Sequence, residues 1–161
     1  MNPPGEHEVR AAGEGARAEQ RILRMTRDGL TGSSIEVTLR RRIEELAQAI
    51  RDKDVDRLMT FYAPDVVVFD VRPPLDTLGR DAYRQNFERW FAMSEGPLGF
   101  VFKDLRVVPG EHTAFCHYLA MVVGSKPGQV SGYWVRGTTC FERREGEWLV
   151  THEHISMPTG R

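Results

Sequence analysis

Hydrophobic residues in the first half of the chain recur at the three- and four-residue spacing of α-helices. The first such helix is predicted from about residue 35, with Ser34 as a candidate N-cap and an apolar face formed by Leu39, Ile43, Leu46, Ala47 and Ile50. A second, short helix is expected after Asp54, which would cap it. A third is expected from Asp81 to about Met93, with its aromatic residues facing inward.

The spacing changes to that of β-strands after Gly96-Pro97. Four strands are predicted, over residues 99–108, 113–124, 130–143 and 147–157, joined by turns at Pro109-Gly110, Pro127-Gly128 and Glu145-Gly146. A shorter strand, 66–71, precedes the third helix. The predicted fold is therefore α+β, with three helices packed on a curved, mostly antiparallel sheet that leaves a pocket between the two layers.

Length and composition favour one globular domain. The chain has 161 residues, which is enough for one ordinary domain but hardly for two. Residues 1–34 are mostly small, polar and turn-prone, and are expected to be a disordered or loosely packed extension that folding does not require. Residues 35–158 are expected to form the domain.

Charge and motif content exclude several classes of partner. A formal net charge of −1 disfavours nucleic acid as a partner, and no apolar run is long enough to span a membrane. The first ten residues lack the apolar segment of a signal peptide, so a cytoplasmic protein with two reduced cysteines is expected. No Gly-rich phosphate loop is present, so no organic cofactor is expected.

The last predicted strand carries the most suggestive chemistry. Regular alternation places His152, His154 and Ser156 on the same face as Trp148 and Val150, whereas Glu153, Ile155 and Met157 lie on the opposite face. The two histidines could act as an acid–base pair, or line the pocket as a hydrogen-bonded structural pair. They could also bind a metal ion with Asp70 or His117 as a third ligand, although no metal is the favoured expectation.

Several further side chains are candidates for the same pocket. Asp70 follows an apolar strand, where it could be a base of raised pKa or a turn residue bonded to backbone N–H groups. Trp134, Arg136 and Thr138 share one face of the 130–143 strand, and the guanidinium needs a partner in the protein or in a substrate. Trp90 and Tyr118 are further expected substrate contacts, and the face that His117 occupies is left open.

Four stretches in this order resemble the NTF2-like superfamily, in its SnoaL-like and ketosteroid-isomerase-like branch. They are residues 54–66, Gly79-Arg80-Asp81-Ala82-Tyr83, Tyr133-Trp134-Val135-Arg136 and residues 148–156. The resemblance implies a cone-shaped pocket, a dimer through the sheet, and functions that range from isomerases, cyclases and hydratases to non-catalytic binders.

The resemblance also limits the reaction. Asp70 falls where ketosteroid isomerases have their base, but Leu46 replaces the helix tyrosine and the residues from Arg136 to Thr139 include no acid, so isomerisation of steroids by that mechanism is not expected.

The resulting hypothesis is a SnoaL-like pocket protein, acting as a cofactor-independent acid/base enzyme of isomerase, cyclase or hydratase type. Its substrate would be a small apolar carbonyl or hydroxyl compound, with Asp70, His152 and His154 as the catalytic candidates. The alternative is a non-catalytic ligand-binding or protein-interaction module. A homodimer is expected through the outer sheet face, where Leu149, Ile155 and Met157 are placed by the alternation.

Overall fold

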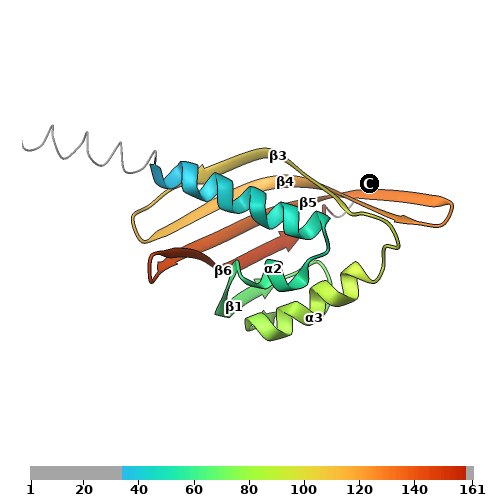
Figure 1. The fold of residues 1–161 in the computed structure, drawn as a ribbon, viewed down its shortest axis with the longest axis horizontal. Coiled ribbons are helices and arrows are strands. Elements are labelled where there is room, and N and C mark those ends of the chain that lie inside the picture. Colours follow the sequence, from blue (N-terminus) through green and yellow to red (C-terminus); the bar gives the residue numbers. More distant parts are fainter. Residues whose placement is uncertain (1–33, 159–161) are drawn as a thin grey trace, which may run out of the picture.

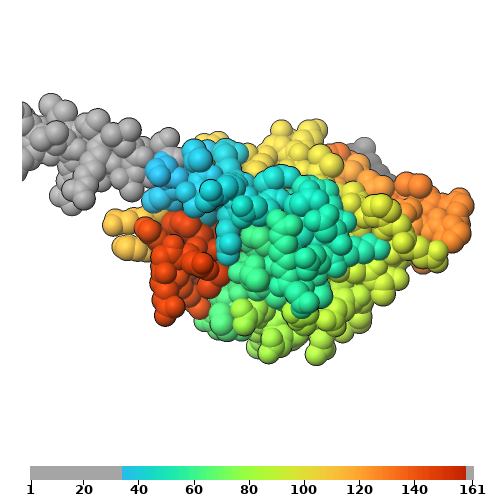
Figure 2. Space-filling model, in the orientation of Figure 1, coloured from blue at the N-terminus to red at the C-terminus, as the bar shows by residue number. Residues whose placement is uncertain are grey.

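The helices lie on one face of a six-stranded sheet, and within residues 34–158 the opposite face of the sheet is left bare (Figure 1). The computed structural model describes residues 34–158, so the predicted N-terminal extension lies outside the described residues. In the space-filling view, the helices cover the centre of the molecule, and the tip of the hairpin between β4 (Thr113–Lys126) and β5 (Gln129–Arg144) projects beyond them (Figure 2).

The helices form where the apolar spacing predicts them. The first covers residues 34–51 and buries the face that contains Leu39 and Ile43. Helix α2 spans Val55–Met59 and is capped by Asp54, whose side chain accepts the Arg57 N–H at 2.9 Å. Helix α3 spans Arg80–Phe91 and buries three aromatic rings, Tyr83, Phe87 and Phe91.

The sheet contains β1 (Tyr62–Phe69), β2 (Thr77–Leu78), β3 (Gly99–Val108), β4 (Thr113–Lys126), β5 (Gln129–Arg144) and β6 (Glu147–Ser156). Their order across the sheet is β2-β1-β6-β5-β4-β3, and only β1 and β6 pair in parallel. The predicted turn between β5 and β6 is confirmed: Glu145 and Gly146 both have positive φ, at 52° and 88°, which is the geometry of a tight two-residue hairpin.

Strand β1 begins four residues earlier than predicted, at Tyr62 instead of Val66. Parallel pairing with β6 accounts for the difference, because Tyr62 lies opposite Val150. The pairing is irregular between Tyr62 and Val67, which allows a proline, Pro64, within the strand although it has no N–H to donate. Strand β2, which pairs with the end of β1, was not predicted because two residues carry no periodicity.

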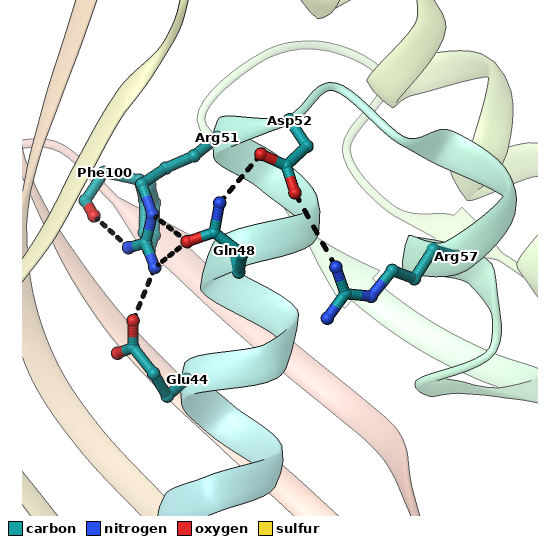
Figure 3. A network of polar contacts seen from close by, with 6 residues as sticks. All are labelled: Glu44, Gln48, Arg51, Asp52, Arg57 and Phe100. Atoms are coloured by element: carbon teal, nitrogen blue, oxygen red, sulfur yellow. Dashed lines mark hydrogen bonds and ion pairs between the residues drawn. The ribbon is translucent and has the colours of Figure 1, made fainter.

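The end of the first helix is attached to the sheet by a polar network (Figure 3). Arg51 donates to the carbonyl oxygen of Phe100 on β3 at 2.9 Å and to the side chains of Gln48 and Glu44. Gln48 in turn donates to Asp52 at 2.7 Å. The network holds the helix over the strand whose Phe100 ring enters the core.

A β-bulge in β6 decides which side chains face the helices. Phe141 pairs with Val150 and the neighbouring Cys140 pairs with His152, so one step on β5 corresponds to two on β6 and Thr151 is the additional residue. Trp148 and Val150 are buried before the bulge, whereas the buried residue after it is Glu153. The alternation of side chains is thus inverted halfway along the strand.

Candidate functional site

The helices and the inner face of the sheet enclose a cavity of about 180 Å³. Its wall is mainly apolar and aromatic, and every layer of the fold contributes to it: Leu46, Ile50, Phe87, Trp90, Phe100, Tyr118, Val122, Tyr133, Val135 and Ile155. An engineered apolar cavity of about 150 Å³ binds benzene, so a molecule with one ring fits a space of this size.

A buried carboxyl group, that of Glu153, forms part of this wall and is only 4% exposed. Its Oε2 accepts the hydroxyl of Tyr83 at 2.8 Å and that of Tyr62 at 3.1 Å, and its Oε1 accepts the hydroxyl of Thr139 at 3.0 Å. Thr139 continues the chain to the hydroxyl of Tyr118 at 3.5 Å. These hydrogen bonds join four strands and α3 through one carboxyl group.

Burial controls the acidity of this cluster. The pKa of Glu153 is raised because its charged form loses contact with water, and the three hydroxyl donors only partly oppose that effect. Burial likewise raises the pKa values of Tyr62, Tyr83 and Tyr118, with the nearby Glu153 adding to each shift. The cluster therefore holds its protons more strongly than the same groups would in water.

A second carboxyl, that of Asp70, lies in the cavity wall just after β1. Its Oδ1 accepts the Val71 N–H at 2.6 Å, so the turn interaction considered from the sequence is present. Its pKa is nevertheless raised, because burial outweighs both this hydrogen bond and the positive charge of Arg72. The Asp70 charge also raises the pKa values of Tyr83 and Glu153, so the two carboxyl groups act on each other.

The mouth of the cavity is more polar. Arg72, Asn86 and Arg89 contribute to its wall, and both arginines are exposed. Arg72 contacts the sulfur of Met93, and Arg89 donates to the Asn86 side chain.

The predicted position of His152 and His154 is wrong. Both follow the Thr151 bulge, so they lie on the outer face of the sheet and take no part in the cavity wall. Nδ1 of His152 is 2.8 Å from the carbonyl oxygen of Val67, and the Phe69 ring packs edge-on against both imidazoles, with centroid distances of 5.0 and 5.9 Å.

The predicted pocket positions of Trp134, Arg136 and Thr138 are also wrong. On β5 the cavity-facing side chains are Tyr133 and Val135, which places the even-numbered residues outside. Trp134 is 41% exposed, and Arg136 is exposed and donates to the Met157 carbonyl at 3.2 Å.

His117, whose side of the sheet could not be assigned from the sequence, also lies on the outer face. It pairs across the sheet with Thr138, which pairs with His154, so these three residues form a row on the outer face. Asp70 lies in the cavity wall on the other side, so the metal site that combined it with the histidines does not form. Among residues 34–158, no three His, Cys, Asp or Glu side chains converge as metal ligands.

The structure brings Asp70, Trp90 and Tyr118 together in one wall, as the sequence predicted, and adds Glu153 and Tyr83. Regular alternation had assigned Glu153 to the outside. The sequence does contain a signal for the bulge. Trp148 and Val150 have even numbers and Ile155 has an odd one, and a regular strand cannot bury all three side chains on the same face.

The chain has relatives of known structure but none among curated sequences. A model of the SnoaL-like domain matches residues 39–160, and no curated protein sequence matches. An NTF2-like protein of unknown function from Pseudomonas putida KT2440 is 32% identical, with a TM-score of 0.73 over 80% of this chain and 89% of that one.

Two more distant structures share the fold. A candidate dehydratase of the NTF2-like family from Streptomyces avermitilis is 17% identical, with a TM-score of 0.73 over 80% of this chain and 99% of its own. The association domain of C. elegans CaMKII is 17% identical, with a TM-score of 0.64 over 79% of this chain and 98% of its own. No helix within residues 34–158 is long and apolar enough to cross a membrane. By the match over residues 39–160 and the similarity to the Pseudomonas putida protein, this chain belongs to the SnoaL-like family of the NTF2-like superfamily.

Proposed function

We propose that this protein is a cofactor-independent acid/base enzyme of isomerase, cyclase or hydratase type, acting on a small apolar carbonyl or hydroxyl compound. The observation that carries the proposal is Asp70, a carboxyl of raised pKa in the wall of an apolar cavity. A carboxylate base of raised pKa removes a proton more effectively near neutral pH than an ordinary aspartate does. Asp70 is the base in this proposal.

The Glu153 cluster supplies the complementary acid. When Glu153 holds its proton, it donates a hydrogen bond to a substrate oxygen, and the hydroxyl of Tyr83 turns from the carboxyl to the same oxygen, where it stabilises the negative charge that develops. A substrate placed between Asp70 and Glu153 thus loses a proton at carbon on one side and is stabilised as an enol or enolate on the other. This step is common to isomerases, cyclases and dehydrating enzymes, and one distant structural neighbour is a candidate dehydratase.

The test is hydrogen exchange at carbon, which needs no knowledge of the natural product. A panel of single-ring carbonyl compounds is incubated with the protein in D₂O, and deuterium uptake next to the carbonyl is followed by NMR. The wild type should accelerate exchange for at least one compound, and Asp70→Asn should lose at least about 100-fold, the usual contribution of a general base. The control is Asp76→Asn, an exposed aspartate outside the cavity wall.

Wild-type rates in Asp70→Asn would refute the assignment of the base. Absence of exchange across the whole panel would favour the second candidate, a non-catalytic binding module. Two observations support that alternative: no histidine is part of the cavity wall among the described residues, and Glu153 already has three hydrogen-bond partners within the protein.

We also propose that the protein forms a homodimer through the bare outer face of the sheet. Phe69, Val101, Phe115 and Trp134 are each more than a third exposed there, around the half-buried Leu119 and Met121. An exposed sheet face that carries this many large apolar side chains, with the polar row of His117, Thr138 and His154 among them, is typical of an interface. Ile155, which the sequence argument had included in it, belongs to the cavity wall instead. The similarity to an association domain supports the proposal.

A further inference from the structure

The mouth of the cavity differs sharply from its interior in charge. Arg72 and Arg89 are the cationic side chains of the wall, and they enter it from two elements, the segment after β1 and helix α3. Within residues 34–158, neither guanidinium lies within 4.0 Å of a carboxylate oxygen. The partners they do have, a thioether sulfur and a side-chain amide, carry no charge.

Another arginine of α3, by contrast, does have carboxylate partners. Arg84, one turn before Arg89 on α3, contacts the carboxylate of Asp56 at 2.7 Å and that of Glu88 at 3.6 Å. Arg89 faces the cavity instead and leaves its charge available at the opening. Asp70 is near enough to Arg72 for the guanidinium to lower its pKa, but no ion pair joins them.

The interior is suited to an apolar body. Leu46, Ile50, Phe87, Phe100 and Val122 contribute no polar side-chain atom to the wall, so a ligand there gains affinity by leaving water. The volume of about 180 Å³ accommodates one ring or a branched chain, and the remainder of a ligand must extend to the mouth. A guanidinium pair at that point is complementary to a planar carboxylate.

From this arrangement, and resting on the proposed function, we infer that the substrate is an organic acid. Its apolar body, of about one ring, occupies the cavity between Asp70 and Glu153, and its carboxylate lies at the mouth between Arg72 and Arg89. The reacting carbonyl or hydroxyl group is then a few bonds from the carboxylate, because Arg72 follows Asp70 by two residues and lies near enough for its charge to act on the Asp70 carboxyl. The substrate class is oxo- or hydroxy-carboxylic acids with an apolar body.

The test compares ligands that share a phenyl ring and a short alkyl chain but carry an anionic, a neutral or a cationic end group. Binding of 3-phenylpropanoate, 3-phenylpropanamide and 3-phenylpropylamine is measured by titration calorimetry on the wild type, on Arg72→Gln/Arg89→Gln and on Arg106→Gln/Arg143→Gln. The last variant loses the same charge from two exposed arginines outside the cavity wall. The wild type should bind the carboxylate about tenfold more tightly than the amide, with the amine weakest.

In the Arg72→Gln/Arg89→Gln variant, the carboxylate and the amide should bind equally, whereas the control variant should keep the preference. Raising the salt concentration should also reduce the preference of the wild type, since the arginines are exposed. The inference is overturned if the wild type binds the amide as well as the carboxylate, if the cavity variant keeps the preference, or if none of the three ligands binds at millimolar concentration. Binding requires no turnover, so a carboxylate preference together with failed deuterium exchange would refute the enzyme and leave the ligand class standing.

Discussion

Replacing Glu153 by glutamine removes an ionisable group from the cavity wall and keeps its shape. In the folded protein burial raises the pKa of this carboxyl above its ordinary value of 4.5, so the native state holds the proton at pH values where the unfolded chain has released it. The stability that this difference contributes is complete below about pH 4.5 and is lost as the pH rises through the native pKa. Glu153→Gln has no such dependence.

The magnitude follows from one proton and three hydrogen bonds. Over the interval between the two pKa values, the wild type loses about 1.4 kcal/mol of stability per pH unit relative to the variant. The hydrogen bonds change little, because the amide oxygen still accepts from Tyr62 and Tyr83 and the Thr139 hydroxyl can turn to accept from the amide NH₂. Their rearrangement costs about 1 kcal/mol at every pH.

The assay is urea unfolding of both proteins at intervals between pH 4 and pH 8, with Glu147→Gln as the control. Glu147 is exposed on the same strand, so its replacement should leave the pH profile unchanged. Asp70, whose pKa is also raised, is present in every protein and contributes to each profile. The argument that burial dominates the pKa of Glu153 would be refuted if the difference in unfolding free energy between wild type and Glu153→Gln stayed constant across this pH range.

Two further predictions concern packing. Gly137→Ala should destabilise the protein by about 1–3 kcal/mol and weaken ligand binding, because a Cβ there would lie 2.3 Å from the Tyr118 ring and push it into the cavity. The control in urea unfolding is Gly124→Ala on the neighbouring strand β4, where the nearest contact of a Cβ is at 3.6 Å. Met121→Glu should convert the expected homodimer to monomers without loss of fold, since it places a charge between Val101 and Trp134 on the bare sheet face. Light scattering that shows a monomeric wild type at about tens of micromolar would contradict the dimer.

The elements were predictable because their signals are local. Asp54 caps its helix by accepting the N–H of Arg57, three residues later, and Glu145-Gly146 forms the turn of a two-residue hairpin. Neither the cap nor the turn depends on distant parts of the chain. The place of Asp70 in the cavity wall was predictable for a similar reason, since a polar residue at the end of an apolar strand lies at the edge of the core.

Local signals do not show which side chains of β5 and β6 face the helices. On β5 both faces carry large rings, Tyr133 inside and Trp134 outside, so composition does not show which faces the helices. On β6 the assignment depends on a single additional residue, which changes pairing with two neighbouring strands. Glu153 was missed because its burial depends on hydroxyl groups from α3, β1 and β5, which approach it only in the folded protein.

The bulge at Thr151 also bears on how this pocket could change its chemistry over evolutionary time. If Thr151 were instead paired regularly, with no bulge, the two sets of side chains beyond it would be exchanged, so that His152 and His154 would turn inward and Glu153 would turn outward. A wall built around a buried acid would become one built around two imidazoles, with no substitution at any of those positions. In this fold a change of strand pairing that straightens β6 at constant length would therefore give a new set of catalytic groups, whereas deletion of Thr151 would remove the bulge and leave Glu153 facing the cavity.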